Sequence, residues 1–136
     1  MKSIEKIKSI ATRTRKKCEN FAMSDAAIMY DFYNYRDLSS MCAIASFVLA
    51  KELNKHNIKA KMVEGAFEGE GHCWVEWKNW IIDITATQFD IEAPVYIVKK
   101  TDEKYKAKKV KQSYKDFRIW PREQKPSKTV CKMIMA

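Results

Sequence analysis

The chain has 136 residues, a net charge of +9 and a hydrophobic fraction of 46%. This composition predicts one folded domain with one core and excludes an intrinsically disordered chain. No run of about 18 apolar residues occurs and no apolar segment follows the basic first residues, so we expect neither a membrane-spanning helix nor a secretory signal.

Positive charge is concentrated towards the two ends of the chain. Residues 1–17 carry seven Lys and Arg against one Glu, and residues 99–128 carry twelve against four acidic residues. Residues 18–98 have six basic against twelve acidic side chains. Either two solvated basic flanks dock on an acidic middle, or residues 99–128 bind an acidic protein partner. Nucleic acid is a minor alternative, because most of the basic residues are Lys and no RNA-binding motif is present.

The first part of the chain predicts three helices. Isoleucines recur at helical spacing over residues 2–17. A short helix is expected after Ser24, and a central apolar helix is expected to end near Asn54. Ser39 or Ser40 is suited to cap the start of the central helix, since a hydroxyl there accepts a free backbone N–H.

After the central helix the hydrophobic residues recur with a period of two, which predicts strands. Four runs fit this pattern as an antiparallel meander: 58–67, 72–77, 80–89 and 95–100. The Lys-rich stretch 101–115 is expected to form a partly solvated helix or a last strand. Helices followed by a sheet define an α+β architecture.

We therefore expect one domain over residues 1–128. It would consist of a helical N-terminal segment (1–37), a core that carries the candidate site (38–100) and a basic C-terminal extension (101–128). The last residues, 129–136, are expected to be disordered.

Three side chains of complementary chemistry fall on these elements. Cys42 lies at the start of the central helix, where the positive helix end favours thiolate over thiol. If the second and third strands pair through a two-residue turn, His72 and Asp83 become diagonal neighbours on one face of the sheet. A carboxylate beside an imidazole fixes its tautomer and stabilises its protonated form. The set therefore predicts a nucleophile (Cys42), an acid/base (His72) and an orienting group (Asp83).

The other reactive residues are not expected to take part in the candidate triad. Cys73 points to the face opposite His72 and is expected to pack in the core, whereas Glu76 shares the His72 face and is expected to pair with a cation. Cys18 and Cys131 belong to no cluster. The four cysteines have no metal-type or disulfide-scaffold spacing, so we expect reduced thiols in a cytoplasmic protein. A zinc site made by the three candidate residues is a weaker alternative without a fourth ligand, so neither metal nor cofactor is predicted.

Further residues would complete the site by binding substrate or an oxyanion. One oxyanion donor is expected from the backbone N–H groups at the start of the central helix. Gln88, Asn34 and Tyr35 are candidates for a second donor by residue type. Trp74 is a further candidate in the substrate-binding set and, because it lies opposite Asp83, is expected to shield the carboxylate–imidazole hydrogen bond from water.

These residues resemble a known family. Cys42 at a helix start, HCWVE at 72–76 and DIT at 83–85 are similar to the Cys, H-x-W-x-E and D-x-T motifs of the transglutaminase-like branch of the papain-like cysteine enzymes. Small bacterial leader proteases of lasso-peptide pathways are similar in spacing and size. The resemblance covers about residues 38–90. It implies a papain-like core in which the nucleophile helix packs on an antiparallel sheet of about four strands.

The triad and the resemblance together predict a thiol-dependent enzyme that acts on an amide carbonyl of a protein or peptide substrate. Peptidase, deamidase and transamidase chemistry share this machinery, because water as acceptor gives hydrolysis and an amine gives cross-linking. The alternative is a non-catalytic binding or inhibitor protein on the same fold. Such a protein would use its basic flanks to engage an acidic protein or nucleic acid.

Overall fold

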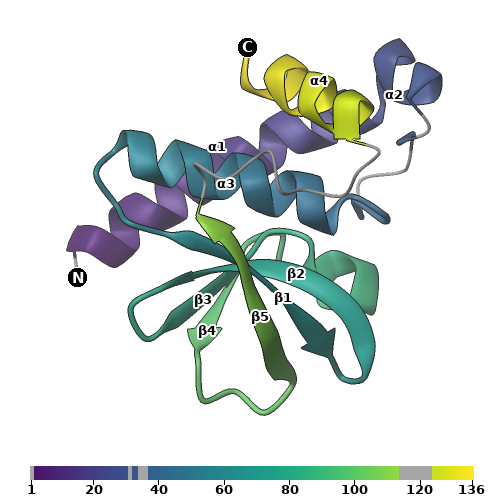
Figure 1. Ribbon diagram of the computed structural model, residues 1–136. Coiled ribbons are helices and arrows are strands. Elements are labelled where there is room, and N and C mark those ends of the chain that lie inside the picture. The colour runs from purple at the N-terminus through teal and green to yellow at the C-terminus, as the bar shows by residue number, and fades with distance from the viewer. Residues whose placement is uncertain (1, 31, 34–36, 114–123) are drawn as a thin grey trace.

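The computed structural model describes residues 2–30, 32–33, 37–113 and 124–136. Its helices lie together on one side of a curved sheet (Figure 1). The α+β architecture is confirmed, and the described residues form five antiparallel strands where about four were expected. In chain order the elements are α1 (Lys2–Ala22), α2 (Asp25–Met29), α3 (Cys42–Lys55), β1 (Lys61–Phe67), β2 (Glu70–Trp77), β3 (Trp80–Asp83), the short 3₁₀ helix η1 (Ala86–Phe89), β4 (Tyr96–Lys99), β5 (Tyr105–Ser113) and α4 (Gln124–Met135).

The hairpin between β2 and β3 has the register that the sequence predicted. Trp77 pairs with Trp80 across a two-residue turn, in which Lys78 adopts a left-handed φ of 51°. The prediction of a strand is wrong beyond Asp83. The carboxylate of Asp83 accepts the backbone N–H of Thr85 at 2.9 Å, which turns the chain out of the sheet and into η1.

β5 shows that the Lys-rich stretch contains a strand rather than a helix. It pairs with β1 at the edge of the sheet, whose strand order is β4-β3-β2-β1-β5. The pairing shifts register twice, and such irregularities combined with Lys side chains are typical of an edge strand that resists further pairing. The basic segment 101–128 is therefore not an appendage to a finished core, because residues 105–113 complete the sheet.

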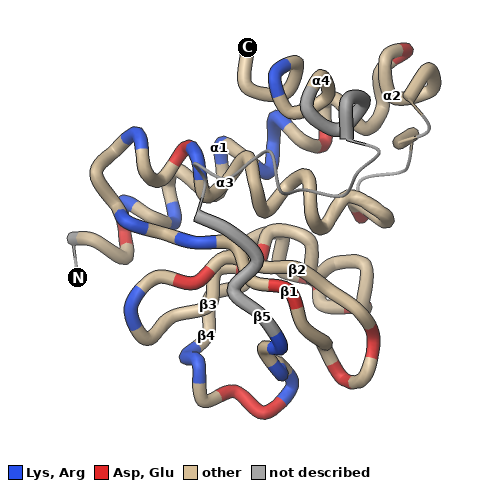
Figure 2. The backbone as a smooth tube through the Cα atoms, viewed as in Figure 1, with Lys and Arg blue, Asp and Glu red and all other residues tan. Residues whose placement is uncertain are grey.

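The described basic residues include two groups in different parts of the molecule. Figure 2 shows Lys and Arg on α1 in the helical layer, and a second group around the ends of β4 and β5 on the far side of the sheet. Lys104, Lys106 and Lys108 are exposed in this second group, and Asp102 lies in the same loop. Among the described residues, these two groups of basic side chains therefore lie on different surfaces.

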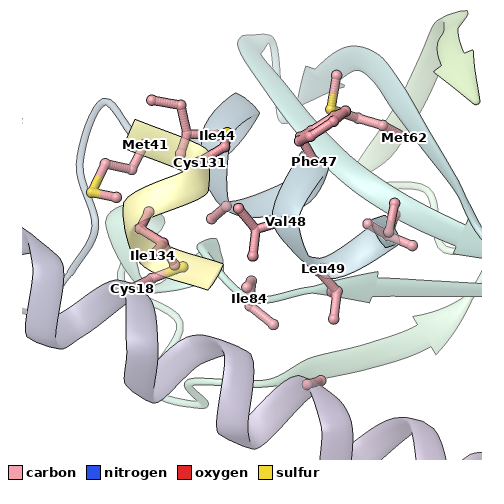
Figure 3. Packing of buried hydrophobic residues seen from close by; sticks show 14 of the residues in the cluster. Cys18, Met41, Ile44, Phe47, Val48, Leu49, Met62, Ile84, Cys131 and Ile134 are labelled. Atoms are coloured by element: carbon pink, nitrogen blue, oxygen red, sulfur yellow. The ribbon is translucent and has the colours of Figure 1, made fainter. Parts of the chain in front are cut away.

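The C-terminal residues 129–136, which were expected to be disordered, form most of α4. Val130, Cys131 and Ile134 are buried on one side of this helix. Figure 3 shows Cys131 and Ile134 packed among residues of α1 and α3. The prediction was wrong because the apolar stripe is short and its partner surface comes from distant parts of the sequence. None of the described helices is long and apolar enough to cross a membrane.

Buried side chains form two clusters, one on each face of the sheet. Val75 and Ile82 face the helices and belong to the larger cluster with α1, α3 and α4. Trp74, Ile81 and Tyr105 lie on the other face and belong to the smaller one. The smaller cluster draws side chains from β4 and β5, which are opposite edges of the sheet, so the sheet curls around it. The candidate site lies at one end of β2, where residues from both sides of the sheet come together.

Gly65 of β1 gives a test of how closely the strands pack in this curl. A Cβ at Gly65 would collide with the backbone oxygen of Lys106 and would lie 2.8 Å from the Trp74 ring. We expect Gly65→Ala to lower the free energy of unfolding by about 1–3 kcal/mol, because neither the backbone nor the buried ring has room to move. Urea denaturation measures the change.

Gly71→Ala is the matched control for this experiment. Gly71 lies on the neighbouring strand β2, and nothing is within 4 Å of where its Cβ would be. We expect the control to change the free energy of unfolding much less than Gly65→Ala. Equal effects of the two substitutions would show that β1 and β5 are not held at this separation.

Candidate active site

A strained turn delivers Cys42 to the start of α3. Leu38 and Ser40 both have left-handed backbones, with φ of 59° and 68°, a conformation that costs non-glycine residues on the order of 1–3 kcal/mol each. Complete burial of the Leu38 side chain and the hydrogen bond from the Ser39 N–H to Asp37 Oδ1, 3.0 Å long, hold the turn. The chain reverses sharply here, so that Cys42 is the first residue of the helix.

The expected serine cap is absent from this helix start. Met41 is the N-cap of α3 and makes no side-chain capping hydrogen bond, because Ser40 lies in the left-handed turn rather than at the cap. The side chain at the N-cap therefore does not take up the first backbone N–H groups of α3. Their positive end favours a thiolate at Cys42 and is suited to bind an oxyanion.

The structure brings His72 and Asp83 together, as the strand pairing predicted. His72 Nε2 lies 2.7 Å from Asp83 Oδ2, and both side chains are fully buried. Burial by itself lowers the pKa of His72, but the hydrogen bond with Asp83, followed by the interaction with Cys42, outweighs it and raises that pKa to about 9. At neutral pH the ring is therefore an imidazolium that faces a carboxylate.

Asp83 is held by two further residues. Its Oδ1 accepts the backbone N–H of Thr85 at 2.9 Å and the Thr85 hydroxyl at 3.4 Å. Its Oδ2 accepts the Tyr105 hydroxyl at 2.8 Å as well as the imidazole. Burial first, and then the charge of Asp83, raises the pKa of Tyr105, which keeps its proton on the phenol as a donor. Tyr105 was missed at the sequence level because it lies on β5, whose register was not predictable.

The surroundings of Cys42 differ from the prediction in one respect. α3 packs on the face of the sheet where Val75 lies, opposite the His72 face. Cys42 therefore meets Cys73, which was expected to serve only as core packing and is indeed buried. A hydrogen bond with the Cys73 side chain, then the interaction with His72, lower the pKa of Cys42 to about 5 against the effect of burial.

The second ring nitrogen of His72 points to how the thiol and the imidazole meet. Nδ1 is buried and has no hydrogen-bond partner among the described residues. Asp83 occupies Nε2, so Nδ1 is the nitrogen left for Cys42. The two groups are close enough for each to shift the pKa of the other. His72 thus interacts with both the thiol and the carboxylate.

Aromatic rings enclose the imidazole. Phe89 lies edge-on to His72 with ring centroids 4.8 Å apart, and Trp74 lies 5.9 Å away. Trp74 is fully buried, so it shields the site rather than offering a surface to substrate. Its indole N–H donates to Glu76 Oε2 at 3.1 Å, and Glu76 pairs with Lys100 at 3.2 Å. The predicted pairing of Glu76 with a cation is confirmed.

The described residues do not identify the expected second donor to an oxyanion. The side-chain amide of Gln88 donates to the Thr85 carbonyl at 3.1 Å, within η1. Asn34 and Tyr35 lie outside the described residues. Of the predicted set, the structure therefore unites Cys42 with the two strand residues and adds Tyr105 and Cys73.

The donor groups are not arranged around a common point. Among the residues that the structure describes, no group of three or more His, Cys, Asp or Glu is placed to hold a metal ion. Asp83 bonds Nε2 of His72 instead, and Cys42 interacts with the same ring. A thiol and a carboxylate that both interact with one imidazole are suited to moving a proton.

Comparison with known proteins identifies a family but no activity. Residues 2–120 match a family described as "Protein of unknown function (DUF2026)". Because the match covers most of the chain, the chain belongs to this family. No curated protein and no solved structure matches it.

The unusual basicity of His72 can be measured directly. We expect its ring to lose a proton with a midpoint of about pH 9, and Asp83→Asn to lower this midpoint, because burial then acts without the carboxylate that opposes it. A pH titration of the two histidine ring signals by NMR tests both points, and His56→Gln assigns the signals. A midpoint near the ordinary 6.5 in the unmodified chain would contradict the charged pair.

Proposed function

We propose that the protein is a thiol-dependent enzyme of transglutaminase-like type that acts on an amide carbonyl of a protein or peptide. One observation carries the proposal: a buried imidazole is held by Asp83 through Nε2 and also interacts with a low-pKa thiol, Cys42. Helix, strand and strand supply the three groups in the order that the resemblance implies. A purely structural role does not call for a thiol pKa of about 5 beside an imidazole pKa of about 9.

The charges of the pair define the first chemical step. Between about pH 5 and about pH 9, Cys42 is a thiolate and His72 an imidazolium. The sulfur attacks the carbonyl carbon, and the carbonyl oxygen takes the negative charge towards the backbone N–H groups at the start of α3. When the C–N bond breaks, the imidazolium gives its proton to the leaving nitrogen, and a thioester remains on Cys42.

The second step returns the enzyme to its starting state. His72, now neutral, accepts a proton from water or from an amine as that acceptor attacks the thioester carbonyl. The C–S bond breaks, and the thiolate–imidazolium pair forms again. Asp83, itself held by Tyr105 and Thr85, keeps the same ring orientation through both steps. Water as the acceptor makes the protein a peptidase or a deamidase, and an amine makes it a transamidase.

Selective alkylation tests the activated thiol. We expect iodoacetamide at pH 6 to modify Cys42, because its pKa of about 5 leaves it mostly as thiolate. Cys18 and Cys131 are built-in controls: both are buried, and burial raises the pKa of each to about 12. Mass spectrometry of peptides from the folded protein locates the modification, and the rate constant for Cys42 is followed from pH 4 to pH 9.

His72→Ala is the variant that links the reactivity to the imidazole. Without the imidazolium we expect the midpoint of the Cys42 profile to move to higher pH, so that alkylation at pH 6 slows by at least about tenfold. If Cys42 reacts no faster at pH 6 than the buried cysteines in the unmodified protein, the thiol is not activated and the proposal is wrong. Incubation with glutamine-containing peptides then separates the reactions by chain cleavage, ammonia release or incorporation of an added amine.

A further inference from the structure

A buried arginine on α1 lies outside the chemistry described so far. Arg15 is only 4% exposed, although most basic residues of α1 face solvent. Its Nη1 donates to the backbone oxygen of Ile84 at 2.7 Å and to Thr87 Oγ1 at 2.8 Å. Its Nε donates to Glu19 Oε2 at 2.8 Å. Ile84 directly follows Asp83, so the guanidinium holds the chain immediately beyond the candidate carboxylate.

The same contact network reaches the turn in front of Cys42. Thr87 Oγ1 accepts from Arg15 and donates to the backbone oxygen of Asp37 at 2.9 Å. The Asp37 side chain accepts the N–H of Ser39 at 3.0 Å, inside the turn that ends at Cys42. One guanidinium therefore connects, through a single hydroxyl, the segments that carry the carboxylate and the thiol.

The hydrogen bonds of Arg15 indicate that its role is to position neighbouring segments rather than only to fill space. A buried charge is costly unless it is fully hydrogen-bonded, and an apolar side chain would fill the same space at lower cost. The planar guanidinium offers donors in fixed directions, which an ammonium on a flexible stem does not. The acceptors Glu19, Ile84 and Thr87 lie on α1, immediately after β3 and in η1, so the guanidinium fixes the relative position of these elements.

We propose that Arg15 is a positioning residue of the candidate active site, which sets the separation of the Cys42 turn from the Asp83–His72 pair through Thr87. The inference rests on the proposed function, because it assigns Arg15 to the alignment of the same three groups. It adds α1, which contributes no reacting group, to the parts of the fold that the site needs.

The test compares two arginines of the same helix. Arg15→Met removes the hydrogen bonds to Ile84, Thr87 and Glu19 and keeps a long side chain, whereas Arg13→Met changes an exposed arginine that bonds to Ser9 Oγ on α1. The readout is the rate constant for alkylation of Cys42 against pH. We expect Arg15→Met to move the midpoint upward by about one unit, which slows alkylation roughly tenfold below the midpoint. Arg13→Met should leave the profile unchanged.

Thr87→Val provides a second variant in case Arg15→Met fails to fold. It nearly keeps the shape of the side chain and removes both the acceptor for Arg15 and the donor to Asp37, so its midpoint should also move upward. Thermal denaturation of each variant measures stability separately. If the folded variants lose stability but keep the profile of the unmodified protein, Arg15 is only structural and the inference is wrong.

The two proposals fail in different ways in this experiment. If the unmodified protein already shows the profile of an ordinary thiol, with a midpoint near pH 8.5, the proposed function fails and takes this inference with it. If the unmodified protein shows the low midpoint and the variants share it, the proposed function stands and only the role of Arg15 is excluded. Arg15→Lys keeps the positive charge but not the planar guanidinium. If this variant has the same pH profile of Cys42 alkylation as the unmodified protein, the charge rather than the geometry of Arg15 is required.

Discussion

The buried carboxylate of Asp83 is the interaction on which the rest of the site depends. It lies in the small cluster inside the curled sheet, where an isolated charge would cost several kcal/mol. Donors from three places compensate this cost: His72 on β2, Tyr105 on β5 and the backbone and hydroxyl of Thr85. Since β2 and β5 are separated by β1 in the sheet, the carboxylate needs the curled sheet as a whole. The strand that ends the sheet is therefore part of the site.

This constraint explains the electrostatic state of the other two groups. Asp83 holds His72 as an imidazolium despite its burial, and the imidazolium in turn favours a thiolate at Cys42. The strained turn before α3 places Cys42 at the positive end of that helix, and Cys73 forms a hydrogen bond with the thiol. Each of these effects lowers the pKa of Cys42, whereas burial raises it. Together these effects favour a thiolate–imidazolium pair at neutral pH.

The sequence predicted those parts of the site that depend on local periodicity. A period of two, together with a two-residue turn between the strands, places His72 and Asp83 on one face of neighbouring strands. It could not reveal which face the central helix covers, and so the role of Cys73 was misread. Tyr105 depends on the register of an edge strand that pairs far along the chain with β1. The prediction of a disordered C-terminus failed similarly, because α4 is stabilised by contacts with α1 and α3 rather than by its own pattern.

The central claim is that Cys42 is a thiolate paired with the imidazolium at neutral pH. The most direct measurement is a pH titration of the ultraviolet absorbance of the thiolate, taken as the difference between the unmodified protein and Cys42→Ser. The account predicts one thiolate that appears with a midpoint of about pH 5 and does not require the unfolding of the chain. A midpoint near the ordinary pH 8.5 of a free thiol would contradict it.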